Sequence, residues 1–225
     1  MAAGTLANSA GAAAKSGAVC TTAGATDSAL KCTKKAGKLV WSKTTSKAAT
    51  SASLDGVWKP TAESKVGYRA KEVLFGQKSE GAGQTNAVTG TMTIVGTTVS
   101  AVDLSADLTK LQSSESRRDA QVQGRILQTA KFPTATLKLM KPISFGKVPS
   151  DGVAVTNSAA VELTMKGVTK TVDVPISARL KAGKIEIAGS IPLTWADWGI
   201  EDPSFAGQIT VEPKGLMEFL VVFAK

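Results

Sequence analysis

Apolar and polar residues alternate strictly on both sides of a short turn in "VELTMKGVTKTVDVPIS", the segment from Val161 to Ser177. Because successive side chains of a strand point to opposite faces, the segment predicts an antiparallel hairpin with one continuous apolar face. That face must be covered by the protein's own core or by a bound molecule. Its members are Val161, Leu163 and Met165 before the turn, and Val172, Val174 and Ile176 after it.

The same alternation recurs from Leu54 to the end of the chain, for example from Val88 to Ile94 and from Ile185 to Trp195. Turn sequences such as "VPSDG", "KAGK" and "EPKG" separate the alternating runs at short intervals. This arrangement is typical of an antiparallel sandwich or barrel. Pro175 cannot donate a hydrogen bond, so we expect its nitrogen to lie outside the ladder or at a bulge.

One helix is predicted among the strands, in "SSESRRDAQVQGRILQ". Ser113 or Ser114 is a suitable N-cap, and Val122, Ile126 and Leu127 follow at helical spacing.

The first 56 residues have a different composition from the rest and predict three parts. Residues 1–18 form an Ala-rich flexible leader, 19–41 a small module with Cys20 and Cys32, and 42–56 a linker. Two cysteines in a short segment with turn residues favour a disulfide-closed hairpin, with two free thiols as the alternative. The chain has no histidine, so it lacks the ligands of an ordinary structural zinc site. A disulfide would place the protein in an oxidising, extracytoplasmic compartment, secreted or in the cell envelope.

The net charge of +9 is concentrated in residues 1–56, which hold seven lysines and two acidic residues. Such a segment suits an anionic envelope surface, or serves as a solvated face that keeps the protein soluble. We expect no nucleic-acid partner, because the lysines accompany no recognition motif. No apolar run is long enough for a transmembrane helix. We find no signal peptide, and expect that one was removed or never present.

Several motifs in a fixed order resemble the YceI-like family over about residues 57–225. They are "VGYRAKEVLFG", Arg118-Asp119, "KFPTATL", "LTMKGVTKTV" and "DWGI". The resemblance implies an all-β fold: an eight-stranded antiparallel lipocalin-like barrel with one short helix. It also implies an apolar interior that holds a polyisoprenoid, a quinone or another long-chain lipid. Two features depart from the family pattern. Many relatives have histidine where Lys166 stands, and the Cys20–Trp41 module is additional.

The polar residues do not point to catalysis. Without histidine the commonest general base is missing, so we predict neither an enzyme nor a cofactor. Asp197, Glu201 and Asp202 could bind calcium, but a polar barrel-end loop is the simpler interpretation, and we predict no metal site. Arg118 and Asp119 could hold the polar head of a ligand, or could fix the helix to the barrel through an ion pair.

We therefore predict a non-catalytic lipid carrier, with a self-filled barrel that acts as an extracellular interaction module as the alternative. Dimerisation is left open. The predicted ligand-binding residues are Tyr68, Leu74, Phe75, Arg118, Phe132, Leu163, Met165, Val174, Ile176, Ile187, Trp195, Trp198 and Phe219.

Overall fold

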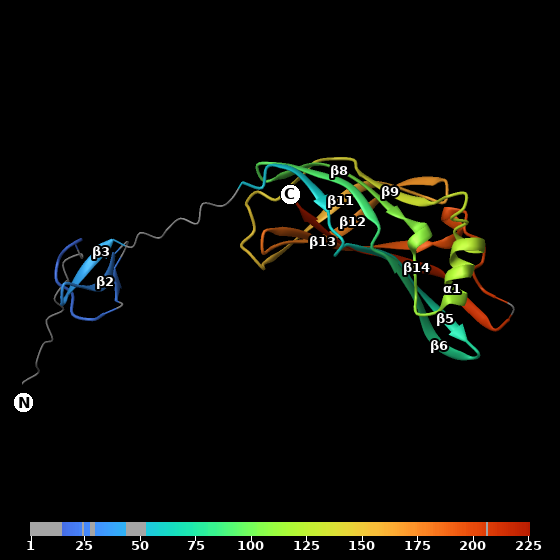
Figure 1. The fold of residues 1–225 in the computed structure, drawn as a ribbon, viewed down its shortest axis with the longest axis horizontal. Helices are drawn as coiled ribbons and strands as arrows, with labels where there is room; N and C mark the ends of the chain where they lie inside the picture. Colours follow the sequence, from blue (N-terminus) through green and yellow to red (C-terminus); the bar gives the residue numbers. More distant parts are fainter. Residues whose placement is uncertain (1–14, 24, 28–29, 44–52, 206) are drawn as a thin grey trace, which may run out of the picture. The chain divides into compact units, whose positions relative to one another are not determined.

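A computed structural model describes residues 15–23, 25–27, 30–43, 53–205 and 207–225. The chain separates into two compact units, Met1–Ala52 and Ser53–Lys225 (Figure 1). Most of the predicted leader and most of the predicted linker lie outside the described residues.

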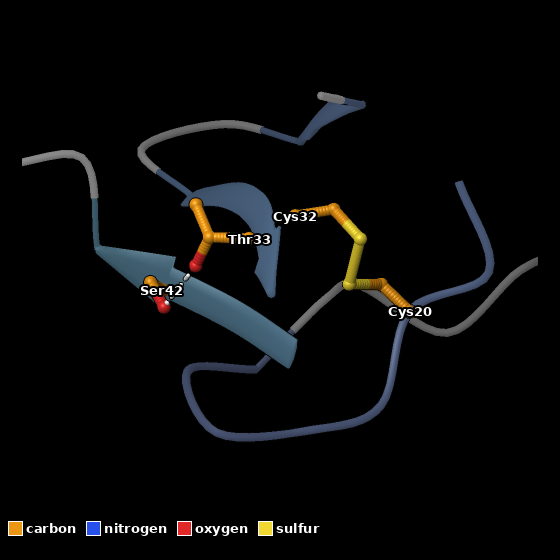
Figure 2. The surroundings of a disulfide bond; sticks show 4 residues. All are labelled: Cys20, Cys32, Thr33 and Ser42. Atoms are coloured by element: carbon orange, nitrogen blue, oxygen red, sulfur yellow. Dashed lines mark hydrogen bonds between the residues drawn. A yellow bond between two sulfur atoms is a disulfide. The ribbon is translucent and has the colours of Figure 1, made fainter. Parts of the chain in front are cut away.

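The N-terminal unit is a three-stranded antiparallel sheet of β1 (Thr26–Asp27), β2 (Leu30–Lys35) and β3 (Lys38–Lys43). Ala36 and Gly37 both have positive φ, as a two-residue type I′ hairpin turn requires. Cys20 and Cys32 form a disulfide with a Cα–Cα distance of 5.9 Å (Figure 2), which confirms the predicted bond. Beside it, the hydroxyls of Thr33 and Ser42 are hydrogen-bonded across 2.8 Å.

Eight strands of the second unit pair in a closed antiparallel ring, in the order β13-β12-β11-β9-β8-β7-β4-β14 and back to β13. The predicted eight-stranded barrel is confirmed. The ring strands are β4 (Gly56–Pro60), β7 (Val88–Val95), β8 (Thr98–Asp107), β9 (Thr134–Leu139), β11 (Ala154–Met165), β12 (Val168–Lys181), β13 (Lys184–Thr194) and β14 (Ile209–Ala224).

Three further strands extend this sheet. The hairpin of β5 (Lys65–Leu74) and β6 (Gln77–Thr85) pairs through β5 with β14, and β10 (Ile143–Ser144) pairs with β8. Three one-turn segments lie between strands: Leu108–Lys110, Val122–Ile126 and Trp195–Trp198.

The predicted hairpin is formed by β11 and β12, with Val161 opposite Val172 and Met165 opposite Val168. Lys166 and Gly167 both have positive φ and make a type I′ turn, which suits the twist of the two strands. The β11–β12 register runs past Pro175 without a shift, and the β12–β13 ladder begins one residue later, at Ile176. Pro175 therefore needs no bulge, because its nitrogen lies before the ladder starts.

The predicted helix is present as α1 (Ser116–Gln121), and a π-helical turn follows it. It begins later than predicted, with Glu115 at the N-cap in place of Ser113 or Ser114. The Ser113 backbone amide instead donates to Asp119 Oδ1 across 2.8 Å, which ties the preceding loop to the first turn. In Figure 1, α1 lies beside the β5–β6 hairpin at one end of the barrel. No described helix has the length and apolar character that crossing a membrane requires.

Candidate functional site

An apolar cavity of about 100 Å³ lies inside the barrel. Its wall comes from inward-facing side chains of β5, β7 to β12, β13 and β14. Within the described part of the chain, Thr136 is the one polar residue in this wall. A space so lined can hold hydrocarbon but offers almost no group that could fix a polar ligand.

The cavity lies where two clusters of buried side chains meet. One cluster contains Trp195, and the other contains Trp58 and Met92. Four half-buried residues pack against both clusters, and all four also line the cavity. The barrel interior is therefore packed solidly on either side and less densely between. The four shared residues are Leu139, Phe145, Ile187 and Phe219.

A second cavity of about 50 Å³ adjoins the first and shares Val99, Phe145 and Ile187 with it. Its wall also includes Lys147 and Arg179, so this cavity has charged residues at its margin. Phe145 follows the short strand β10, and its backbone amide donates to Thr97 O across 3.0 Å. Phe145 is thus one of the three residues that belong to the walls of both cavities.

The larger cavity is small for a lipid. An engineered cavity of about 150 Å³ accepts benzene, and pockets for drug-sized ligands span about 300–1,000 Å³. A guest with a long hydrocarbon chain must therefore displace wall side chains. Phe145 and Ile187 are half-buried and line both cavities, so we expect them to move most readily.

Five of the residues predicted from the sequence line the cavity, and they come from four strands. The cavity-lining wall of β7 to β10 was not predicted as a site, although its apolar alternation was visible in the sequence. The five lining residues are Leu163, Val174, Ile176, Ile187 and Phe219.

Three predicted residues lie deeper in the cluster that contains Trp195. Met165, Trp195 and Trp198 are buried there and do not line either cavity. Trp195 Nε1 donates to Glu212 O across 2.6 Å, so its polar edge is satisfied by the barrel itself. These residues close the barrel at the end where the Trp195–Trp198 turn follows β13.

Three further predicted residues lie at or near turns. Phe132 is half-buried, and its ring lies under the hairpin turn at Gly167. Leu74 is half-buried at the end of β5. Phe75 occupies a positive-φ position of the β5–β6 turn and is 72% exposed. None of the three is in the wall of either cavity.

A polar cluster lies between α1 and the β5–β6 hairpin. Arg118 Nη2 donates to Glu72 Oε1 across 3.0 Å, and the Glu72 side chain is only 6% exposed. This ion pair joins the helix to β5. Tyr68 lies four residues before Glu72 on the same face of β5. Its hydroxyl is buried, and burial raises the pKa of Tyr68 to about 12.

Two of the three acidic residues that follow Trp195 have polar partners. Asp197 Oδ1 lies 3.8 Å from Lys170 Nζ. Asp202 Oδ1 accepts a hydrogen bond from the Ser204 backbone amide across 2.9 Å. No group of three or more potential metal-binding side chains occurs in the described ranges.

A family model described as "YceI-like domain" matches residues 59–223. The structure is similar to that of a polyisoprenoid binding domain from Saccharophagus degradans implicated in plant cell wall breakdown. The two share 15% identity with a TM-score of 0.62, over 75% of this chain and 97% of that one. Burkholderia cenocepacia BcnA shares 16% identity with a TM-score of 0.53, over 72% of this chain and 96% of that one.

No curated protein matches the chain. At these identities the solved structures establish the fold, whereas the family model spans most of the sequence. Its matched region begins within β4 and ends within β14, so it coincides with the closed ring of strands. The chain belongs to the YceI-like domain family.

Proposed function

We propose that the barrel binds a long apolar lipid along its axis, without catalysing a reaction. The observation that carries this proposal is the apolar cavity inside a closed barrel. Each methylene buried there contributes about 0.8 kcal/mol, so ten contribute about 8 kcal/mol before association costs are subtracted. Hydrocarbon burial alone can therefore retain a polyisoprenoid, a quinone or a long-chain acyl lipid.

Occupation by such a lipid requires the barrel interior to open. Phe145 lines both cavities, and its backbone amide is bonded to Thr97 O in the β7–β8 turn. Rotation of this side chain would join the two spaces into one channel without breaking a strand pair. The likeness to the Saccharophagus degradans domain, described as polyisoprenoid binding, agrees with a guest of this shape.

We place the protein outside the cytoplasm, secreted or in the cell envelope. The disulfide supports this location, because such bonds persist in oxidising compartments.

The N-terminal unit carries a surface suited to an anionic envelope polymer. Lys31, Lys35 and Lys38 are exposed, and the β2–β3 register puts them on one face. Lys35 lies directly opposite Lys38, a like-charge pair that costs stability in a small sheet. A polyanion bound to this face would offset that repulsion.

A second function is favoured by the small volume of the cavity. A barrel filled by its own side chains could serve as an extracellular interaction module, with the N-terminal unit making the contacts. This alternative requires no guest and no rearrangement of Phe145.

Native mass spectrometry of the untagged protein, prepared from a native-like host, separates the two functions. A stoichiometric adduct, identified after denaturation as an isoprenoid or acyl compound, is expected for the lipid carrier. An apo mass that is unchanged after incubation with quinones, polyprenols and fatty acids would refute the carrier and favour the interaction module. The same spectrum reports whether the chain dimerises.

A further inference from the structure

The hydroxyl of Tyr68 is buried and has no hydrogen-bond partner within the described part of the chain. Such a group is costly, because its hydration is lost and not replaced. Tyr68 is the single tyrosine of the sequence. A phenylalanine at this position would fill the same apolar volume without that cost, so the hydroxyl calls for a partner.

The Tyr68 ring continues the wall of the apolar cavity. Val66 lines the cavity and lies two residues before Tyr68 on the same face of β5. On the adjacent strand β14, Phe219 pairs with Val66 and Met217 pairs with Tyr68, and both β14 residues line the cavity. The tyrosine therefore lies just beyond the cavity, toward the end covered by α1.

Strand β6 provides the room for this arrangement through Gly83 and Gly81. A Cβ at Gly83 would lie 2.7 Å from Tyr68 Cε1. At Gly81 it would lie 3.0 Å from Glu72 Oε2 and 3.3 Å from Arg118 Nε. Any larger residue would displace the ring or the ion pair, so the two glycines define a polar end to an otherwise apolar interior.

The charges around the hydroxyl disfavour an anionic guest. Three charged side chains interact electrostatically with the Tyr68 hydroxyl: Arg118, Glu72 and Asp119. Their one positive and two negative charges give a net charge of −1. Arg118 is already paired with Glu72. The phenol keeps its proton far above neutral pH, so it is available as a donor. A neutral oxygen acceptor fits this site better than a carboxylate or a phosphate.

We propose that Tyr68 donates a hydrogen bond to a neutral carbonyl or ester oxygen at the head of the lipid whose tail fills the barrel. This inference rests on the proposed function and narrows the ligand to neutral lipids with an oxygen acceptor. Met217 lines the cavity and is the β14 register partner of Tyr68, so we expect its side chain to move when the head reaches the hydroxyl.

The test compares two probes with the same number of heavy atoms, dodecyl acetate and hexadecane, on the full chain. Affinities come from displacement of a fluorescent apolar probe. We expect Tyr68→Phe to lower the affinity for dodecyl acetate about three- to tenfold, which is the effect of one hydrogen bond. The affinity for hexadecane should change by less than about twofold. Thr85→Val is the matched control, because it removes a buried hydroxyl that accepts from the Ala87 amide within its own turn. It should change neither affinity.

A second measurement does not depend on a variant. Tyrosine labelled with ¹³C at Cζ gives one signal, which should shift on addition of dodecyl acetate and stay in place with hexadecane. If both probes bind but neither the signal nor the affinity ratio responds, the head-group assignment is wrong while the lipid-binding function stands. Tighter binding of dodecanoate than of dodecyl acetate would likewise overturn the preference for a neutral head. Failure of every probe to bind would refute the proposed function itself.

Discussion

Arg118 of α1 lies 3.0 Å from Glu72 of β5, and the Glu72 carboxylate is almost completely withdrawn from solvent. The pair bridges a sequence separation of 46 residues and joins the helix to the β5–β6 hairpin. Removal of one partner leaves a buried charge without compensation, which is far costlier than the loss of an exposed pair.

Arg118→Met should therefore lower the free energy of unfolding by about 3 kcal/mol, measured by urea denaturation. Arg69→Met is the control, because Arg69 also pairs with glutamates, Glu218 at 3.0 Å and Glu80 at 3.1 Å, but all three side chains are 41% exposed or more. That variant should cost less than about 1 kcal/mol. Equal losses in the two variants would contradict the structural role of the Arg118–Glu72 pair.

We expect the protein to lose free energy of unfolding at alkaline pH because of the buried phenol of Tyr68. Its pKa rises from 10.0 to about 12 on folding, because burial disfavours the phenolate. The unfolded chain therefore releases the proton at lower pH than the folded chain, and stability falls as pH rises from about 10 to about 12. Two pKa units correspond to about 2.7 kcal/mol, and solvent screening of the half-buried ring reduces the expected effect to about 2 kcal/mol.

Urea denaturation at several pH values from about 9 to about 12, a range that spans the tyrosine pKa, measures how the free energy of unfolding changes with pH. Lysines also titrate there, so the informative quantity is the difference between the native sequence and Tyr68→Phe. The variant should lose less stability with rising pH. Parallel curves would show that the phenol titrates alike in the folded and unfolded states.

The sequence predicted the hairpin of β11 and β12 because strand periodicity and a Lys-Gly turn are local properties. It also predicted the disulfide, because Cys20 and Cys32 are close along the chain. Phe75 was predicted as a ligand-binding residue, but the turn gives it a positive φ and turns it toward solvent. Phe145 was not predicted at all, because it follows a two-residue strand without a periodic pattern. Within the described ranges the Tyr68 hydroxyl has no hydrogen-bond partner, and this depends on packing between strands far apart in the sequence, which no local pattern encodes.

Lys31, Lys35 and Lys38 lie exposed on one face of the N-terminal sheet, and we expect this face to bind an anionic polymer. Lys31→Gln, Lys35→Gln and Lys38→Gln together should weaken binding of a labelled long-chain polyphosphate about tenfold at low salt, in a fluorescence polarisation assay. Binding by the native sequence should fall as salt is added.

The control for that variant changes net charge equally but in the second unit, at the exposed residues Lys59, Lys71 and Lys78. It should retain most of the binding. If both triple variants lose the same affinity, the polymer responds to overall charge, and the N-terminal face is not a specific contact.

The small volume of the cavity offers a direct distinction between a carrier and a self-filled barrel. Ala159 is buried and lines the cavity, so Ala159→Leu would place three additional carbon atoms in that space. We expect unfolding stability to change by less than about 1 kcal/mol, because filling the void offsets the strain of the larger side chain. Uptake of a fluorescent long-chain lipid should fall at least tenfold, since the guest and the new side chain compete for one volume.

Ala101→Leu is the matched control, on the solvent face of β8, and it should leave lipid uptake unchanged. Gly189→Leu is less informative, because even a Cβ there would lie 2.6 Å from Phe219 Cζ and 3.0 Å from Pro175 O. Its folding would suffer whether or not a lipid binds. Undiminished uptake by a stably folded Ala159→Leu protein would mean that the lipid binds elsewhere, because the space beside residue 159 cannot hold both.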